Sequence, residues 1–259
     1  MSLQYELSYI KQHYRELFLD VQAELTADLS RLAGSEPCAA PGCTCAEAQA
    51  EDALLSVYPA SCGRRRWQQA CLHFLEQETG REILTALDGM DAEKNRVDCH
   101  QCGVCCRFAS SEFSWETLCE KARQGDAFAA QFTSVFLPYA SDEAASAAFP
   151  ELVTAIRREA RLQNGDDATG TASDSAAVYF YHCPFIAEDN RCSIYGTTRR
   201  PGICARYPET PLSFIYDKCA WKSWKDDNHL KAMRTHAQIE LCMFYAARIK
   251  AVLMNTPAA

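Results

Sequence analysis

Apolar side chains at the start of the chain recur at alternating intervals of four and three residues. The series runs through Leu3, Leu7, Ile10, Tyr14, Leu17 and Val21, and it resumes at Leu25, Leu29 and Leu32. Charged residues flank this seam, which is the a/d pattern of an amphipathic helix. The pattern predicts a helix over residues 1–33 that ends at Gly34. Such a seam packs either on the helix's own domain or on a partner, for which a second copy of the chain is one candidate.

Helical periodicity dominates the rest of the sequence as well. It predicts helices over residues 65–87, 114–124, 126–136, 141–163 and 226–254, with Ser114 as a candidate N-cap. The aromatic, β-branched run from Val178 to Tyr181 predicts one short strand. Residues 35–62 and 183–219 are rich in Pro, Gly and Cys and predict irregular structure. We therefore expect a mainly α fold with an irregular cysteine-rich metal-binding core and little β structure.

Composition bounds the organisation and the partners. The chain has 259 residues, 48% of them apolar, so it can bury a core without help from a metal. We expect a helical extension with a Cys-containing loop over residues 1–90. A cysteine-cluster domain with the C-terminal helix follows over residues 91–259. The net charge of −8 argues against nucleic-acid binding. The charged N-terminal segment and the lack of a long apolar run predict a cytoplasmic protein without a membrane span.

Cysteines carry the candidate chemistry. There are 15 in the chain, and a reducing cytosol would keep them as thiols. Residues 99–106 read Cys-His-Gln-Cys-Gly-Val-Cys-Cys, which places Cys99, Cys102 and Cys105 at successive two-residue spacings, with Cys106 adjacent. This is the spacing with which a ferredoxin loop directs three sulfurs to one cluster, and a zinc knuckle uses it for two of its ligands.

Four remote cysteines complete a set of eight, the ligand number of two four-cysteine sites. They are Cys183, Cys192, Cys204 and Cys219. Side chains of adjacent residues usually diverge, so one compact site would rarely take both Cys105 and Cys106. Our hypothesis is that Cys99, Cys102 and Cys105 bind one centre and that Cys106 joins a second centre with remote cysteines. Cys183, followed by Pro184 as in ferredoxins, is the favoured fourth ligand of the first centre, although any of the remote four could take this place.

Basic residues cluster around these cysteines in an otherwise acidic chain. They are Arg107, Arg191, Arg199, Arg200, Arg206, Lys218 and Lys222. Thiolates around a buried metal leave negative charge that needs balancing, so this bias supports metal ligation. His100 and His182, which flank candidate ligands, are alternatives for a ligand place or for a hydrogen bond to sulfur.

The other cysteines divide into two kinds. Cys38, Cys43, Cys45 and Cys62 lie in the predicted N-terminal loop, where they could form a further metal site or remain unliganded thiols. Cys71 and Cys242 lie on apolar helix faces and are expected to fill the core, as is Cys119.

The cysteine segments together resemble a known family. The segments are Cys-His-Gln-Cys-Gly-Val-Cys-Cys-Arg, Cys-Pro-Phe-Ile, Cys-Ser-Ile-Tyr and Arg-Pro-Gly-Ile-Cys-Ala-Arg-Tyr-Pro, within residues 97–245. They resemble the bacterial YkgJ-type cysteine cluster proteins, described as zinc- or iron-chelating domains and related to the cysteine domain of flagellin lysine methylases. The resemblance implies metal binding. The interval from Cys192 to Cys204 is longer than the family's usual form, and Arg206 follows Cys204 one position later.

Three functions follow from these observations. The first is an iron–sulfur protein with two [4Fe–4S] clusters for electron transfer or a redox step, with an unknown redox or protein partner. The second is a zinc-stabilised interaction module without catalysis. The third is a protein-modifying enzyme similar to the flagellin methylases, although the sequence has no methyl-donor motif. Three cysteines at successive two-residue spacings and the Cys-Pro pair favour iron–sulfur clusters over zinc.

Overall fold

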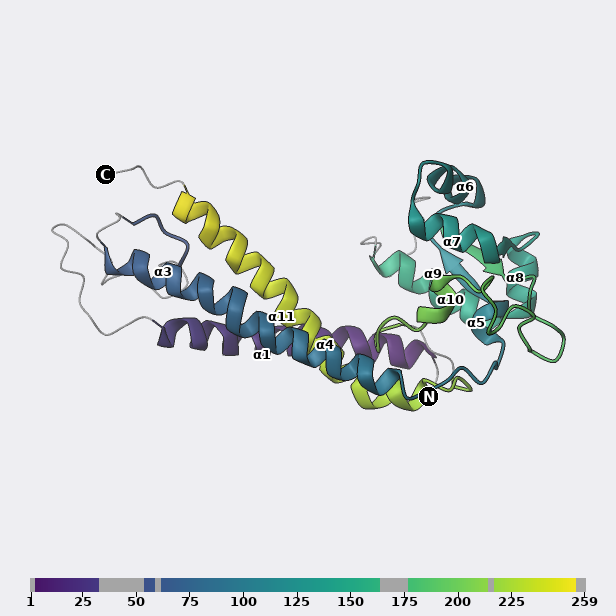
Figure 1. Ribbon diagram of the computed structural model, residues 1–259, viewed down its shortest axis with the longest axis horizontal. Helices are drawn as coiled ribbons and strands as arrows, with labels where there is room; N and C mark the ends of the chain where they lie inside the picture. Colours follow the sequence, from purple (N-terminus) through teal and green to yellow (C-terminus); the bar gives the residue numbers. More distant parts are fainter. Residues whose placement is uncertain (1–2, 33–53, 59–61, 164–176, 214–216, 255–259) are drawn as a thin grey trace. The chain divides into compact units, whose positions relative to one another are not determined.

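The computed structural model describes residues 3–32, 54–58, 62–163, 177–213 and 217–254 (Figure 1). The chain divides into two compact units. The cysteine unit comprises Met1–Ile10 and Val97–Asp226, and the helical unit comprises Lys11–Arg96 and Asp227–Ala259. The described residues are mainly helical with one small sheet, which confirms the predicted fold class. No helix among them is long and apolar enough to cross a membrane.

Long helices that lie alongside one another build the helical unit (Figure 1). They are α1 (Leu3–Arg31), α3 (Gly63–His73), the π-helix η1 (Phe74–Thr79), α4 (Gly80–Lys94) and α11 (Lys222–Met254). The predicted second helix thus extends to Lys94 and contains a π-helical turn. Residues from Asp227 onward belong to this unit, whereas the sequence-based division places the whole C-terminal helix with the cysteine domain.

The predicted seam of α1 faces the core of its own unit. Val21, Leu25 and Leu29 are buried at 2%, 6% and 2% exposure in one cluster with side chains of α3, α4 and α11. The indole Nε1 of Trp67 donates a 2.9 Å hydrogen bond to the Leu29 carbonyl, which fixes α3 against α1. This part of the seam is therefore covered within the chain. A homodimer through the N-terminal helix would have to use another face of these turns.

Three cysteines fill the core of the helical unit. Cys71 and Cys242 are buried, at 0% and 8% exposure, which confirms the expectation that they pack as small apolar groups. Cys62 is also fully buried in this core. Cys38, Cys43 and Cys45 lie outside the described residues, so the further site remains a prediction.

Alkaline pH should destabilise the helical unit through these thiols. Burial raises the pKa of Cys71 from 9.0 to about 12 and that of Cys242 to about 11. The folded state holds the neutral thiols, so their contribution is fully present below pH 9 and is lost as the pH rises toward 11–12. We expect the free energy of unfolding, measured with guanidinium, to fall more steeply between pH 8 and pH 10 in the unaltered chain than in the Cys71→Ala/Cys242→Ala variant. Equal slopes would contradict this assignment.

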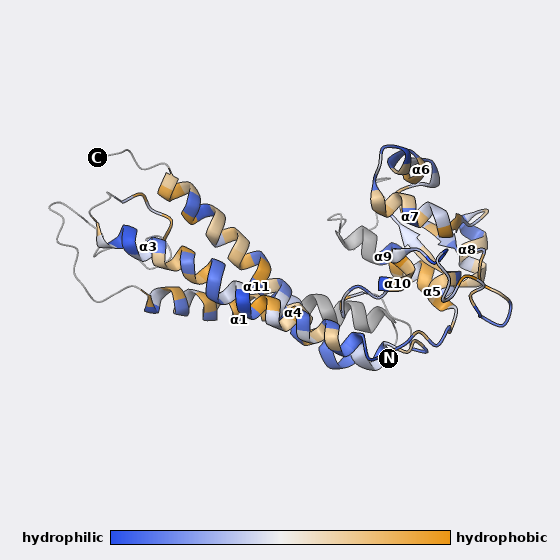
Figure 2. Ribbon diagram, viewed as in Figure 1, coloured by the Kyte–Doolittle hydropathy of each residue, from blue (hydrophilic) through white to orange (hydrophobic). Residues whose placement is uncertain are grey.

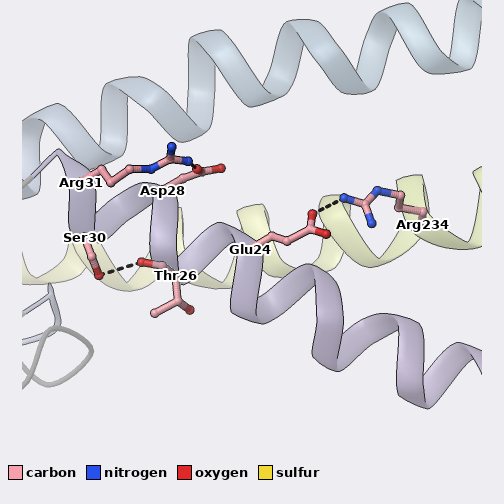
Figure 3. A network of polar contacts seen from close by, with 6 residues as sticks. All are labelled: Glu24, Thr26, Asp28, Ser30, Arg31 and Arg234. Carbon is pink, nitrogen blue, oxygen red and sulfur yellow. Dashed lines mark hydrogen bonds and ion pairs between the residues drawn. The ribbon is translucent and has the colours of Figure 1, made fainter.

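Polar contacts on the surface of the helical unit join α1 to α11 (Figure 3). Arg234 pairs with Glu24, and Arg31 pairs with Asp28 within α1. Ser30 donates a 2.8 Å hydrogen bond to the Thr26 carbonyl. These side chains are mostly exposed, and such ion pairs contribute only about 0–1 kcal/mol each. Apolar burial, rather than this network, holds the two helices together.

Short elements around a three-stranded sheet build the cysteine unit. They are α5 (Val104–Arg107), β1 (Ala109–Ser111), α6 (Trp115–Arg123), α7 (Ala127–Val135), β2 (Leu137–Pro138), α8 (Asp142–Ala148), α9 (Pro150–Gln163), β3 (Tyr179–His182) and α10 (Gly202–Arg206). The predicted strand is β3, the centre of the antiparallel order β1-β3-β2. Ala109 pairs with Tyr181 and Leu137 pairs with His182. The segment that follows the first cysteine loop is thereby fixed beside the strand that leads to Cys183.

Local chemistry explains where these helices begin and end. The Ser114 hydroxyl accepts a 3.2 Å hydrogen bond from the Thr117 N–H, as predicted for an N-cap, and Asp126 caps α7 in the same way. The expected single helix over residues 141–163 is instead two helices, α8 and α9. The break falls at Phe149, because Pro150 lacks an N–H and disfavours helical backbone in the residue before it.

Candidate metal centre

All eight predicted ligands line one cavity of about 830 Å³ within the cysteine unit. They come from four places in the chain: the first loop, the residue after β3, the segment that contains Cys192 and Cys204, and the residues before α11. A volume of this size is typical of small-molecule and cofactor sites. The fold therefore gathers residues separated by up to 120 positions around a single space.

The first loop contains two residues with left-handed backbone, and they let the chain curve around the cysteine sulfurs. Gln101 has φ 57° and Gly103 has φ 79°, and the short helix α5 follows. A Cβ built on Gly103 would lie 2.6 Å from Oδ1 of Asn190 and 2.8 Å from its Cβ. Position 103 thus requires glycine both for its φ and for the close approach of Asn190. Figure 2 shows α5, which carries Cys105 and Cys106, in hydrophobic colours.

A small hairpin after Cys183 packs against this loop. Ile186 forms an antiparallel bridge with Cys192, and Asn190 occupies the turn with φ 68°. The guanidinium of Arg107 donates to Asn190 Oδ1 at 2.9 Å and to the Ala187 carbonyl at 2.8 Å. Charged donors make strong hydrogen bonds, so Arg107 joins α5 to the hairpin and holds Cys192 near the loop.

Further hydrogen bonds tie the remote segments to the loop. The Cys183 N–H donates to the Cys106 carbonyl at 2.7 Å, and the Cys192 N–H donates to the Gln101 side-chain oxygen at 3.0 Å. The His100 Nε2 lies 2.7 Å from the Lys218 carbonyl, next to Cys219. His100 is therefore engaged with the backbone and fixes the segment before α11 against the loop.

One group of four cysteines shares a single apolar cluster. Its members are Cys106, Cys183, Cys192 and Cys204, packed with aromatic and aliphatic side chains that include Phe132, Tyr181 and Ile194. The thiol of Cys204 interacts electrostatically with the other three, and that of Cys183 with Cys106 and Cys192. We call these four cysteines the second group.

The remaining four cysteines form the first group: Cys99, Cys102, Cys105 and Cys219. Cys219 hydrogen-bonds with Cys102 and interacts electrostatically with Cys99. Cys105 interacts with Cys99 and Cys102 and also with its neighbour Cys106, so the two groups meet at this vicinal pair. Cys99 and Cys219 pack against Trp221 and Trp224, an apolar cluster separate from that of the second group.

The remote cysteines are therefore divided differently from the sequence-based expectation. Cys183 lies with Cys106 and not with Cys99, Cys102 and Cys105, because the sheet and the Cys183 N–H bond fix it beside Cys106. Cys219 occupies the place expected for Cys183. The thiols of Cys105 and Cys106 do not diverge as expected, since they hydrogen-bond with each other.

Three of the eight cysteines each accept the same kind of local hydrogen bond from a backbone N–H. The sulfur of Cys99 accepts from the Gln101 N–H at 3.4 Å, and Cys183 and Cys219 accept from the backbone of Phe185 and Trp221. In each case the donor lies two residues after the cysteine. A hydrogen bond of this kind favours the thiolate, which is the form that binds metal. These backbone donors therefore offset part of the rise in pKa that burial causes at the three thiols.

Two arginines act on the thiol of Cys106. The hydrogen bond from Cys105 lowers the pKa of Cys106, and the guanidinium groups of Arg200 and Arg107 lower it further against the effect of burial. The same hydrogen bond and burial raise the pKa of Cys105. Arg200 is held by a 2.7 Å hydrogen bond to the Cys204 carbonyl and by the Tyr195 ring, 4.5 Å from its guanidinium carbon.

Several other basic residues predicted to balance the site have other partners. Arg191 pairs with Asp189, Arg206 with Glu209 and Lys222 with Asp226. Arg199 lies over the Phe185 ring, with its guanidinium carbon 5.4 Å from the ring centre. Of the basic residues in this segment, Arg107 and Arg200 therefore act on the thiols, whereas the others named here make contacts at the surface.

Burial favours the neutral thiol at several of the candidate ligands. Burial raises the pKa of Cys99 and Cys219, that of Cys183 to about 11 and that of Cys204 to about 12. Within the described residues, no three or more His, Cys, Asp or Glu side chains are arranged so that they could hold a metal ion. Metal binding here would therefore release protons and reorient side chains.

Sequence reasoning missed three residues that shape the site: Gln101, Gly103 and Asn190. The sequence held a signal for Gly103 and Asn190, because glycine and asparagine are the residues that most readily adopt a positive φ in turns. The role of Gln101 depends on its contact with Cys192 in a distant segment and had no sequence signal.

A comparison with known proteins gives no match to a family model, to a curated protein or to a solved structure.

Proposed function

We propose that this chain is an iron–sulfur protein that carries two four-cysteine clusters and serves electron transfer or a redox step. The first group, Cys99, Cys102, Cys105 and Cys219, would hold one cluster. The second group, Cys106, Cys183, Cys192 and Cys204, would hold the other. Four cysteine ligands are the usual set for a [4Fe–4S] cluster.

The division of eight thiols into two fours is the observation that supports this proposal. Thiols within each group interact with one another, and Cys99 and Cys105 of the first group also interact with Cys106 of the second. The second group lies in one apolar cluster, and Cys99 and Cys219 of the first group lie in another, and such apolar surroundings limit solvent access to a cluster. The vicinal pair Cys105 and Cys106 contributes one sulfur to each group.

The surroundings fit a negatively charged sulfur-ligated group. Backbone N–H donors already reach three of the eight sulfurs. Arg107 and Arg200 supply positive charge next to Cys106, and the buried indole N–H of Trp221 has no acceptor among the described residues. When bound, iron–sulfur clusters supply one-electron transfer at potentials set by hydrogen bonds to sulfur, net charge and solvent exposure.

Anaerobic purification of the full chain followed by metal analysis tests the proposal. We expect about eight iron and eight acid-labile sulfide per chain, as two [4Fe–4S] clusters require. Reduction should bleach the visible absorption and produce the paramagnetic resonance of reduced clusters. A colourless protein with stoichiometric zinc and no sulfide would reject the proposal in favour of a zinc-stabilised module.

A further inference from the structure

The side chain of Trp221 presents a buried hydrogen-bond donor without an acceptor. Trp221 is 7% exposed, and its Nε1 is shielded from solvent. Among the residues that the structure describes, no atom accepts a hydrogen bond from this nitrogen. A buried N–H normally has a partner, because leaving it unpaired costs the free energy of its desolvation. The indole therefore lacks an acceptor that the functional state would be expected to supply.

The surroundings of Trp221 indicate what that acceptor is. Trp221 lines the same cavity as the eight cysteines and packs against Cys99 and Cys219 of the first group. Its own backbone N–H already donates to the Cys219 sulfur. The Trp221 backbone hydrogen bond and the packing of its side chain therefore hold the indole ring next to the first group. Indole has no acceptor atom, so the side chain can stabilise only a hydrogen-bond acceptor in the cavity.

We propose that the indole N–H of Trp221 donates a hydrogen bond to a sulfur of the centre held by the first group. This inference rests on the proposed iron–sulfur function, and it assigns to Trp221 the role of a positioning residue that tunes one of the two clusters. A hydrogen bond to sulfur stabilises the reduced cluster more than the oxidised one, because the reduced form carries more negative charge. Trp221 therefore raises the reduction potential of the first cluster and leaves that of the second unchanged.

Trp224 offers a matched control in the same apolar cluster. It is buried to a similar extent, at 5% exposure, and it packs beside Trp221. Trp224 is not among the residues that line the cavity, and it has an interaction partner of its own. A change that affects packing alone should act equally at both positions. A change that removes a hydrogen bond to the centre should act only at Trp221.

The test replaces each tryptophan in turn with benzothienylalanine, which has nearly the same shape but carries sulfur in place of the N–H. In the anaerobically purified full chain, we expect iron and sulfide to match the unaltered protein for both variants. At position 221 the midpoint potential of one cluster should fall by about 59 mV, which for a one-electron couple corresponds to a tenfold change in the reduction equilibrium. At position 224 both potentials should stay unchanged.

Unchanged potentials at full cluster content for the Trp221 variant would overturn the inference, as would equal shifts in both variants. If the replacement at position 221 prevents loading, the ¹⁵N-indole spectrum of the loaded unaltered chain decides. A hyperfine-shifted N–H proton for Trp221 but not for Trp224 supports the hydrogen bond, and its absence rejects it. A sulfide assay on the unaltered chain tests the proposed function separately. Absence of sulfide there would reject that function and this inference with it.

Discussion

The Cys102→Ala/Cys219→Ala variant is expected to retain about half of the bound iron, with one cluster intact. These two residues belong to the first group, in which Cys219 hydrogen-bonds with Cys102. Removing both leaves two thiolates there, too few to retain a four-cysteine cluster, and leaves the second group complete. The Cys183→Ala/Cys204→Ala variant should likewise retain half of the iron, because it disables only the second group. Iron and sulfide per chain, with paramagnetic resonance of the reduced samples, measure both.

The crossed variant Cys102→Ala/Cys183→Ala serves as the control for this division. It removes the same number of thiols but takes one from each group, so neither cluster keeps four cysteines. We expect the spectrum of an intact cluster to be lost in this variant and kept in the two within-group variants. If the crossed variant kept one intact cluster while Cys102→Ala/Cys219→Ala lost both, Cys183 would belong with Cys102 and the division would be refuted.

Replacing Gly103 with alanine should destabilise the cysteine unit and empty both groups of metal. Alanine at φ 79° pays a left-handed backbone cost of about 1–2 kcal/mol. Its Cβ would also overlap Asn190, whose side chain accepts from Arg107, and loss of that charged hydrogen bond costs about 1.5–3 kcal/mol. We expect a loss of about 3 kcal/mol in the free energy of unfolding, measured by denaturant titration. Iron content should fall in both groups because the hairpin then leaves the loop.

Gly196 provides the matched control for this substitution. Its φ is 72°, and a Cβ built on it would meet nothing within 4 Å. Gly196→Ala therefore pays the backbone cost of about 1–2 kcal/mol without displacing a neighbour, and the protein should keep its metal. Similar losses of stability and of iron in the two variants would show that the approach of Asn190 does not matter.

Much of the secondary structure followed from local signals. The periodicity of Val21, Leu25 and Leu29 predicted a helix with one buried face, and the structure buries that face. Ser114 predicted a helix start through its hydroxyl, and it caps α6. The helix over residues 141–163 was predicted without a break because its apolar pattern continues through Pro150, although the missing N–H divides it. Local chemistry thus decided even the element that periodicity misjudged.

The candidate site followed from the sequence only in part. Spacing alone predicted the Cys99 loop as a chelating segment, because two-residue spacers bring successive sulfurs to one side of a tight turn. The adjacency of Cys105 and Cys106 predicted diverging side chains, whereas their thiols hydrogen-bond with each other. The π-helical turn before Gly80 and the role of Gln101 had to come from the structure, because they depend on packing or on a residue about 90 positions away.

The sequence by itself determined a mainly helical chain with eight candidate ligands, since helix patterns and chelating spacings are properties of neighbouring residues. Only the tertiary structure decided which remote cysteine meets which part of the loop. Cys183 is fixed beside Cys106 by β3 and its backbone hydrogen bond, and Cys219 is brought to Cys102 by the segment before α11. A cysteine far along the chain has no geometric relation to the loop until sheet pairing and apolar burial create one.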